Sequence, residues 1–481
     1  MLSKSAGASR VVVVGGGLAG LSAAFESLRN GVKEVVLFDK EKRTGGNSAK
    51  ASSGMNAAET RAQKEQHIDD TWQLFDADTF KAGHDAGDRK LVEVMSKESA
   101  AAVDFLESFG LNLSAIVQGG GHSKPRTHRI APPADGRPLK NFGLELMFLM
   151  AQKAESTPGL KVMTRATVKS LLKEGGAVVG VEYAMDGTEA TDKMEAGATV
   201  VATGGFGAER KLLREFVPHL SNLPTTNGPF ATGDGLSMLR EAGAGLTMMD
   251  AVQIHPSGFI DPSDPDARVK WLAPEALRAA GGVLLNQQGN RFVNELSYRD
   301  VVANSILENG FKVSSAENAS QCAHLVLPEG SQPIFPIPPI YIKRGYVKVA
   351  KSIGEAADHM GIDASTLQKT LSEYDTAVEK GKDEFGKTVF PSKFNAEKEN
   401  TSIFVMTITP SIHYTMGGVK IDTSARVLTE GDDVIPGVFA AGEVTGGIHG
   451  RNRLVGNGLL DNVVFGRIAG KVAAEQVAKK E

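Results

Sequence analysis

Runs of apolar residues bounded by glycines and polar turns divide the chain into strands and helices. The first run, Val11–Val14, is fully apolar, as expected of a parallel strand buried on both faces. A glycine-rich turn and a helical pattern follow it. A second apolar run then ends in Asp39. The pattern predicts a βαβ unit at the start of the chain.

The rest of the chain falls into broad blocks. Residues 60–115 are polar, charged and helical in character, and residues 160–203 have the pattern of strands. Residues 431–450 hold another apolar strand that ends at a glycine and an acid. A helix with lysines near its C-terminus is predicted from about Leu459 onward. Residues 250–412 differ, because prolines are frequent there and helical and strand patterns mix.

The turn after the first strand carries the spacing of a dinucleotide-binding motif. Gly15, Gly17 and Gly20 follow G-x-G-x-x-G between a strand and a helix. Asp39 closes the next strand about twenty residues later, as the motif requires. An acid at this position binds ribose hydroxyls and disfavours a 2′-phosphate, which indicates NAD or FAD rather than NADP.

Further glycine-rich turns favour FAD over NAD. They lie at residues 202–205 (ATGG), 232–235 (TGDG) and 440–443 (AAGE). A cofactor contacted along its length by several distant segments is typical of FAD that stays bound. The N-terminus of the helix near Leu459 would stabilise negative charge on a reduced flavin ring.

Nucleotide-type turns at both ends and a distinct block between them predict one domain interrupted by another. The predicted fold class is α/β, with a Rossmann-like FAD-binding domain that is interrupted by an inserted α+β capping domain. We expect residues 1–249 and 414–481 to form the FAD-binding domain and residues 250–413 the capping domain.

Composition limits the partners and the compartment. The 481 residues carry 53 Lys and Arg against 57 Asp and Glu, so neither nucleic acid nor a membrane is expected as a partner. The single cysteine, Cys322, cannot form an internal disulfide, and no Cys/His set predicts a metal site. The longest apolar stretch, Val11–Phe25, is too short to cross a bilayer. We expect a cytoplasmic protein; the alternative is an organelle lumen or matrix, with a targeting segment removed.

One basic stretch stands out in this slightly acidic chain. Residues 448–458, IHGRNRLVGNG, set His449, Arg451 and Arg453 among glycines. Glycines let the backbone approach a ligand closely, and arginines bind flat anions through two oxygens at once. The stretch therefore indicates an anion site.

The motifs of this chain resemble those of a known family, the soluble FAD-dependent fumarate reductases. That family includes yeast-type fumarate reductase and the flavin part of bacterial flavocytochrome c, and the resemblance covers about residues 10–478. It is carried by GGNSAKASSGMNA, GGGHSKPRTHR, TTNGPFATGDG, QIHPSGF, EALRAAGGVLLNQQGNRFVNELSYRD, HYTMGGVKI and AAGEVTGGIHGRNRL. The resemblance implies FAD-dependent reduction of fumarate to succinate, which is oxidoreductase chemistry on a CH–CH bond.

The resemblance also implies how FAD is held. No histidine occupies the attachment loop around Asn47 and Ser48, so non-covalent FAD is expected. The implied cofactor contacts are Gly15, Gly17, Leu18, Ala19, Gly20, Asp39, Lys40, Gly45, Gly46, Asn47, Ser48, Ser52, Ser53, Gly54, Val168, Thr203, Gly204, Gly205, Thr226, Asn227, Asp234, His413, Tyr414, Gly442, Glu443, Arg453, Gly456, Leu459 and Leu460.

Substrate contacts follow from the same resemblance. It implies that His255, His413 and Arg453 bind the two carboxylates of a small dicarboxylate, fumarate or succinate, and that Gln253 touches flavin or substrate. Arginine suits one carboxylate because it can bind both oxygens. Two other histidines, His122 and His128, are either part of a hydrogen-bonded loop or line the site.

The resemblance assigns proton transfer to three residues. Arg299 resembles the family's proton donor to one alkene carbon, while flavin N5 delivers hydride to the other. Glu275 and Arg278 resemble the relay that resupplies the proton, and their spacing would place them on one helix face. Arg299 could otherwise pair with Asp300 or Glu295 on a surface.

Several alternatives stay open. Arg451 and Val455 depart from the family pattern beside the expected substrate and flavin edge. Rival functions are reduction of urocanate or a cinnamate, a dehydrogenase or oxidase that runs in the opposite direction, and a flavin carrier without substrate chemistry. The electron donor would be free reduced flavin or a partner protein, and we expect a monomer. The resemblance allows an alkali cation near residues 415–417 and Glu443.

Overall fold

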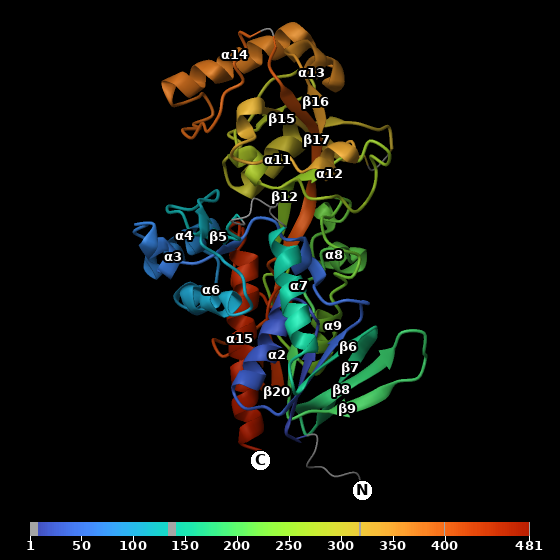
Figure 1. Ribbon diagram of the computed structural model, residues 1–481. Coiled ribbons are helices and arrows are strands. Elements are labelled where there is room, and N and C mark those ends of the chain that lie inside the picture. Colours follow the sequence, from blue (N-terminus) through green and yellow to red (C-terminus); the bar gives the residue numbers. More distant parts are fainter. Residues whose placement is uncertain (1–7, 133–140, 317–318, 399, 481) are drawn as a thin grey trace. The chain divides into compact units, whose positions relative to one another are not determined.

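The computed structural model describes residues 8–132, 141–316, 319–398 and 400–480 (Figure 1). It divides into two compact units. The first unit comprises Met1–Pro218, Gly228–Val252 and Tyr414–Glu481, and the second comprises His219–Asn227 and Gln253–His413. The predicted mixed α/β fold, in which one unit interrupts the sequence of another, is confirmed.

A mostly parallel sheet lies at the centre of the first unit. Its strands are β1 (Arg10–Val14), β2 (Glu34–Asp39), β6 (Leu160–Thr164), β10 (Ala198–Val201), β19 (Arg426–Leu428) and β20 (Val434–Ala440). Their order is β19-β20-β10-β1-β2-β6, and the β19–β20 pair is antiparallel. The order reverses between β1 and β10, which is the switch point where sheets of this type bind ligands beyond their carboxyl ends.

Two helices pack closely beside this sheet. Figure 1 shows α2 (Leu18–Arg29) and α15 (Asn457–Ala478) side by side. A Cβ at Gly466 would lie 2.5 Å from the Ala19 carbonyl oxygen, and one at Gly470 would lie 2.3 Å from that of Ala23. The glycines of α15 therefore allow the last helix of the chain to contact the backbone of the nucleotide-type helix.

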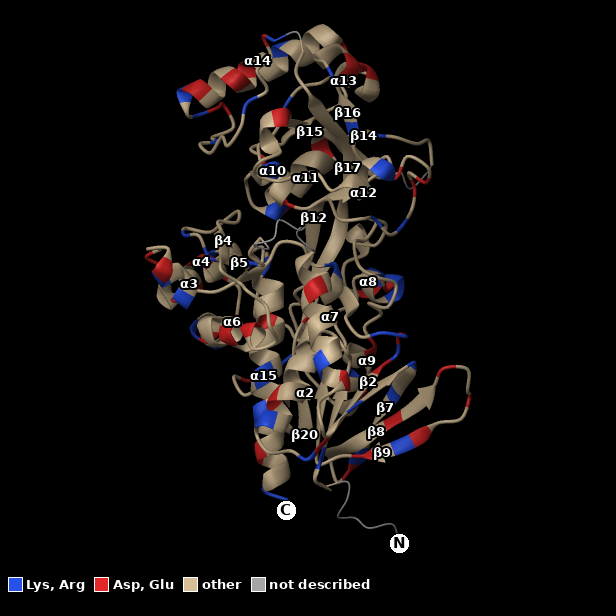
Figure 2. Cartoon of the chain, in the orientation of Figure 1, with Lys and Arg blue, Asp and Glu red and all other residues tan. Residues whose placement is uncertain are grey.

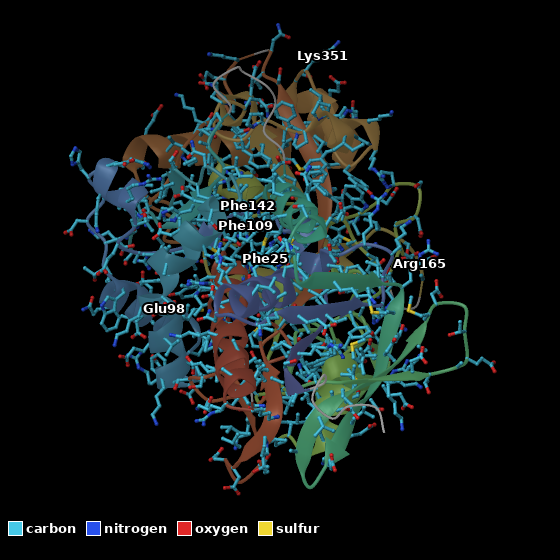
Figure 3. The ribbon with its side chains drawn as sticks, turned by 60° about the horizontal axis from the view of Figure 1, so that its bottom comes forward. Phe25, Glu98, Phe109, Phe142, Arg165 and Lys351 are labelled. Carbon is cyan, nitrogen blue, oxygen red and sulfur yellow. The ribbon has the colours of Figure 1, made fainter. Side chains whose placement is uncertain are left out.

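Smaller elements complete the first unit. The rings of Phe25, in α2, and Phe109 lie 4.8 Å apart, and both residues are labelled in Figure 3. The other elements are η1 (Gly46–Lys50), β3 (Met55–Asn56), α3 (Arg61–Glu65), α4 (Trp72–Ala82), α5 (Arg89–Lys97), α6 (Ser99–Glu107), β4 (Ala115–Val117), β5 (Thr127–Arg129), α7 (Phe142–Glu155), β7 (Ala166–Glu174), β8 (Ala177–Met185), β9 (Asp192–Glu195), α8 (Arg210–Phe216), α9 (Asp234–Ala242), β11 (Leu246–Thr247) and β18 (Gly418–Val419). A short turn, η2 (Pro218–Leu220), spans the boundary between the units.

The second unit is built on a sheet of order β12-β17-β15-β13. Its elements are β12 (Val252–Phe259), α10 (Ala276–Ala279), β13 (Val283–Leu285), α11 (Arg299–Asn309), β14 (Phe311–Lys312), β15 (Gln321–Pro328), η3 (Glu329–Ser331), α12 (Pro339–Lys343), β16 (Lys348–Ala350), α13 (Ile353–Met360), α14 (Ala364–Lys380) and β17 (Ile403–Thr415). The terminal residues Val252 of β12 and Tyr414 and Thr415 of β17 belong to the first unit. Successive residues of a strand face opposite sides. Accordingly Leu325 and Met406 pack in one apolar cluster, and Val326 and Val405 in another.

Charged residues of both signs are mixed over the elements. Figure 2 shows Lys and Arg interspersed with Asp and Glu along α14 and along β7–β9. None of the helices in the described part of the chain combines the length and apolar character that a membrane span requires.

Candidate functional site

The turn from β1 to α2 requires glycine at two positions. Gly15 has a φ of +107°, and a Cβ there would lie 2.3 Å from the Ala202 carbonyl oxygen. A Cβ at Gly20 would lie 1.8 Å from the Gly15 carbonyl oxygen. No side chain fits at such distances, so these glycines hold the strand, the turn and the helix together, as the spacing predicts.

Gly17 has a different surrounding. It is the N-cap of α2 and provides no side-chain cap, and a Cβ there would meet nothing described nearer than Ser48 Oγ at 4.0 Å. The backbone N–H of Leu18 donates to that hydroxyl at 3.4 Å. Open amides at a helix N-terminus bind phosphate. The turn is therefore a cradle that fits the pyrophosphate of a dinucleotide, lined by Leu18 and Ala19.

Asp39 is held in a fixed orientation at the end of β2. Its Oδ2 accepts from Gly16 N at 2.9 Å and its Oδ1 from Glu41 N at 2.8 Å. Burial raises the pKa of Asp39, although both hydrogen bonds lower it. A carboxylate oriented in this way fits ribose hydroxyl groups.

Lys40 and Asp234, both expected to contact the cofactor, contact each other. Lys40 Nζ lies 2.7 Å from Asp234 Oδ2 and 2.5 Å from Thr232 Oγ1. The group joins the end of β2 to the start of α9. Thr232 was not predicted, although it lies in the TGDG turn that the sequence singles out.

The loop over residues 45–54 brings polar groups to the same region. Gly45 and Gly46 have positive φ values, and Asn47 Oδ1 accepts from Gly228 N at 3.0 Å. Ser52 Oγ and Thr203 Oγ1 are buried without a hydrogen-bond partner among the described residues. Buried polar atoms are almost always hydrogen-bonded. These two hydroxyls therefore fit contact with a polar cofactor.

Three further residues expected to contact the cofactor, two of them in this loop, have other surroundings. Gly54 has a φ of +110°, and a Cβ there would lie 2.4 Å from the His128 carbonyl oxygen. Ser53 beside it is partly exposed. The side chain of Val168 packs in an apolar cluster with Val12 and Phe38. Cofactor contacts of Ser53 and Val168 stay predictions.

A second group of glycines surrounds Glu443. A Cβ at Gly205 would lie 2.5 Å from Glu443 Oε1, and one at Gly442 would lie 2.5 Å from Asn462 Oδ1. Gly204 has a φ of +75°. Glu443 Oε1 accepts from Thr415 N at 2.9 Å. Burial raises the pKa of Glu443 to about 7. Among the described residues, no group of three or more His, Cys, Asp or Glu side chains is placed to hold a metal ion.

The start of α15 is anchored by a buried amide that the sequence analysis missed. Gly456 has a φ of +84° and is the N-cap. Asn56 Nδ2 donates to the Val455 carbonyl oxygen and to Asn457 Oδ1, each at 2.6 Å. Leu459 and Leu460 follow in the first helical turn, which begins at Asn457, slightly before the predicted start. The helix N-terminus is thereby fixed in place, as binding of an anionic flavin edge requires.

In the second unit, three segments meet at Arg299. This arginine begins α11 and is 6% exposed. Its Nε donates to Glu275 Oε2 and its NH1 to Gln253 Oε1, both at 2.8 Å. Arg278 NH2 lies 3.6 Å from the same Glu275 oxygen. The structure thus brings together the expected proton donor, its relay and Gln253. It does not show the alternative, a surface pair of Arg299 with Asp300 or Glu295.

Arg278 is held in place by a hydrogen bond to a residue that sequence reasoning missed. It is buried, which lowers its pKa, and its NH1 donates to the Glu295 carbonyl oxygen. The Glu295 carboxylate in turn accepts from Arg291 and from Lys387, each at 2.9 Å. Glu295 lies in the quoted motif GNRFVNELSYRD, but the sequence gives no sign that its carbonyl oxygen is the functional group.

His255 is buried with a defined tautomer. Its Nδ1 accepts from the backbone N–H of Ser257 at 3.2 Å. Because a backbone N–H can only donate, Nδ1 has no proton, and Nε2 carries it in the neutral ring. The ring lies 5.0 Å from that of His413, centroid to centroid. The neutral His255 ring is therefore a hydrogen-bond donor at Nε2.

His413 is held by two residues expected to contact the cofactor. Its Nδ1 lies 2.7 Å from Thr226 Oγ1, and its carbonyl oxygen accepts from Asn227 Nδ2 at 3.2 Å. Thr226 and Asn227 belong to the second unit with His413. Their observed contacts position this histidine, and cofactor contact by them stays a prediction.

In the first unit, Arg453 is buried against an aromatic ring. Its guanidinium carbon lies 4.4 Å from the centre of the Tyr414 ring. Tyr414 Oη donates to Asp461 Oδ2 at 2.9 Å, and His449 Nε2 lies 3.4 Å from the same oxygen. Arg451 instead is half-exposed and pairs with Asp250 at 2.8 Å. The expectation that the basic residues of this stretch form one anion site is therefore wrong for Arg451, which points to the surface, and His449 binds a carboxylate of the protein itself.

The two histidines left open are both buried. His128 Nδ1 lies 2.9 Å from the Arg126 carbonyl oxygen and its Nε2 2.8 Å from Thr60 Oγ1. His122 Nε2 lies 3.2 Å from the Val455 carbonyl oxygen. For His128 the hydrogen-bonded loop is the better interpretation, whereas His122 supports the turn before α15.

Comparison with known proteins identifies the family of this chain. The family described as "FAD binding domain" matches residues 10–459. Fumarate reductase of Schizosaccharomyces pombe is 40% identical over 484 residues, which cover 98% of this chain and 90% of that protein. Fumarate reductase 1 of Saccharomyces cerevisiae is 38% identical over 484 residues, which cover 98% of this chain and 98% of that protein.

A solved structure gives the same result for the fold. The open conformation of a flavocytochrome c3 fumarate reductase has a TM-score of 0.78 and 34% identity, covering 97% of this chain and 78% of that one. The fold and the site thus define an FAD-dependent oxidoreductase that acts on CH–CH bonds. The chain belongs to the FAD binding domain family and, within it, to the fumarate reductase flavoproteins.

Proposed function

We propose that this protein reduces fumarate to succinate with non-covalently bound FAD. The observation that carries the proposal is the buried arrangement of Arg299, which donates to Glu275 and to Gln253 at 2.8 Å each. A cation fixed beside a carboxylate can give a proton and take one back.

We further propose residues 1–249 and 414–481 as the FAD-binding domain and residues 250–413 as the capping domain.

The histidines and Arg453 would bind the dicarboxylate. His255 offers Nε2–H to one carboxylate, and His413, fixed by Thr226, offers a second polar contact. Arg453 offers the bidentate contact that a carboxylate favours. A substrate with two carboxylates makes use of all of these groups, whereas urocanate and cinnamate carry only one.

The proton would come from Arg299. FAD, when bound, would supply the electrons as a hydride for one alkene carbon. A guanidinium has a pKa above ~12 in water, so it protonates only a strongly basic carbon, such as a developing carbanion. Glu275 would then return a proton to Arg299. Arg278, whose pKa is lowered by burial, would in turn supply a proton to Glu275.

Reoxidation of bound flavin tests the proposal. The bound flavin is reduced under anaerobic conditions, and fumarate, urocanate or cinnamate is added separately. Fumarate should restore the flavin absorbance rapidly, and the two monocarboxylates should not. Equal rates with all three acids, or no reaction with fumarate, would contradict the proposal.

Free reduced flavin or a partner protein is the proposed electron donor.

A further inference from the structure

Arg453 lies in a cluster of buried polar side chains within the first unit. Tyr414, His449 and Asp461 are each less than one-tenth exposed, and they come from three separate segments of the chain. The ring of Tyr414 lies 4.4 Å from the Arg453 guanidinium carbon on one side. The Tyr414 ring also packs against the ring of His449, with centroids 5.5 Å apart and an interplanar angle of 78°.

Asp461 is the shared acceptor of this cluster. Its Oδ2 accepts from Tyr414 Oη at 2.9 Å and lies 3.4 Å from His449 Nε2. Burial lowers the pKa of His449, so a neutral ring donates here. Asp461 stands in the first turns of α15, where the helix dipole favours a negative charge.

The hydrogen bond to Asp461 has a consequence for Arg453. Burial and the nearby carboxylate raise the pKa of Tyr414 well above its ordinary value, so the phenol stays protonated and donates. A phenol that donates to a carboxylate carries more negative charge on its ring, because hydrogen bonds polarise one another. A more negative ring face attracts a guanidinium more strongly.

We propose that Asp461 is a positioning residue that orients Arg453 for the substrate through Tyr414 and His449. The inference rests on the proposed function, in which Arg453 binds a substrate carboxylate. Asp461 fixes the phenol, the phenol ring fixes the guanidinium, and His449 contacts the same carboxylate oxygen as the phenol. Weakening any link lets the guanidinium leave the orientation that binds two carboxylate oxygens at once.

Succinate binding to the oxidised FAD-loaded protein tests the inference. Tyr414→Phe keeps the ring but removes the hydrogen bond, and Asp461→Asn removes the charge. Each should raise the succinate Kd measured by calorimetry, and the fumarate KM, roughly tenfold, and Asp461→Asn should leave the FAD content unchanged. The control is Arg467→Gln on the same helix, which removes the ion pair of Arg467 with Glu26 at 3.1 Å and should leave the Kd as in wild type.

A double-mutant cycle separates positioning from a merely structural role. If Asp461 acts through Arg453, then Asp461→Asn should have no further effect on the succinate Kd in an Arg453→Gln background. Additive effects, or loss of FAD from Asp461→Asn, would overturn the inference. If the wild-type protein binds succinate and neither Tyr414→Phe nor Asp461→Asn changes the Kd, only this inference is overturned. If the wild-type protein binds no succinate, the proposed function is overturned as well.

Discussion

Arg299 donates from Nε to Glu275 Oε2 at 2.8 Å, although the two residues are 24 positions apart in the sequence. The contact joins the loop before α10 to the first residue of α11 within the second unit. The carboxylate that would return a proton to the arginine is therefore also the group that fixes the arginine in place.

Replacing Glu275 by glutamine should uncouple these two roles. The amide oxygen of Glu275→Gln can still accept from Arg299, but the side chain cannot carry a proton to it. We expect kcat for fumarate to fall by about 10²- to 10⁴-fold while FAD content stays normal. Steady-state turnover and flavin absorbance measure the two quantities. The matched control is Glu308→Gln, an exposed change on α11; an unchanged kcat in Glu275→Gln would remove the relay from the mechanism.

Gly17 should report on cofactor binding without disturbing the fold. Its φ of −74° is accessible to any residue, and the nearest described atom to an added Cβ is 4.0 Å away. Gly17→Ala should therefore melt like wild type without cofactor, yet bind FAD more weakly because the methyl enters the proposed pyrophosphate cradle. The ratio of flavin to protein absorbance after gel filtration measures this loss. The matched control is Gly431→Ala, where an added Cβ also has room.

Arg451 and Arg453 should behave differently although one residue separates them. Arg451 is half-exposed in a surface pair with Asp250, and such pairs contribute about 0–1 kcal/mol. Arg451→Gln should therefore leave the fumarate KM close to wild type. Arg453→Gln should raise that KM by about 10²-fold or more, because a charged hydrogen-bonding partner of the substrate is lost. Equal effects of the two changes on KM would show that Arg453 has no special role.

The sequence predicted local patterns better than contacts between distant segments. The strand, turn and helix over Val11–Val14, Gly15, Gly17 and Gly20 follow from short-range spacing, and the structure has them as expected. The grouping of Arg299 with Glu275 was predicted through family motifs, because spacing along the chain gives no distance between residues so far apart.

Three features lay beyond such reasoning for physical reasons. Arg451 was expected beside the substrate. The direction of its side chain depends on the backbone conformation of the neighbouring glycines, and the amino-acid sequence does not specify that conformation. Asn56 and Asp461 act by hydrogen bonds to residues 399 and 47 positions away in the sequence. The role of Glu295 depends on its backbone carbonyl, a group that every residue has.

Two buried histidines should make the protein sensitive to acid. Burial lowers the pKa of His128 and of His324 to about 4, from an ordinary 6.5. Between these values the unfolded chain binds a proton at each site and the folded chain does not, so the free energy of unfolding falls as the pH falls from 6.5 towards 4. Each site should contribute about 2 kcal/mol of this loss between pH 7 and pH 5.

Urea titrations at pH 7 and pH 5, with FAD in excess, measure this loss. His128→Gln should lower stability at pH 7, since it disturbs the contacts with Thr60 and Arg126, but it should show a smaller drop between the two pH values than wild type. His324→Gln should behave in the same way for the second unit. The control, His219→Gln, replaces an exposed ring and should keep the wild-type drop. A drop in His128→Gln as large as in wild type would mean that His128 is protonated in the folded protein or accessible to water.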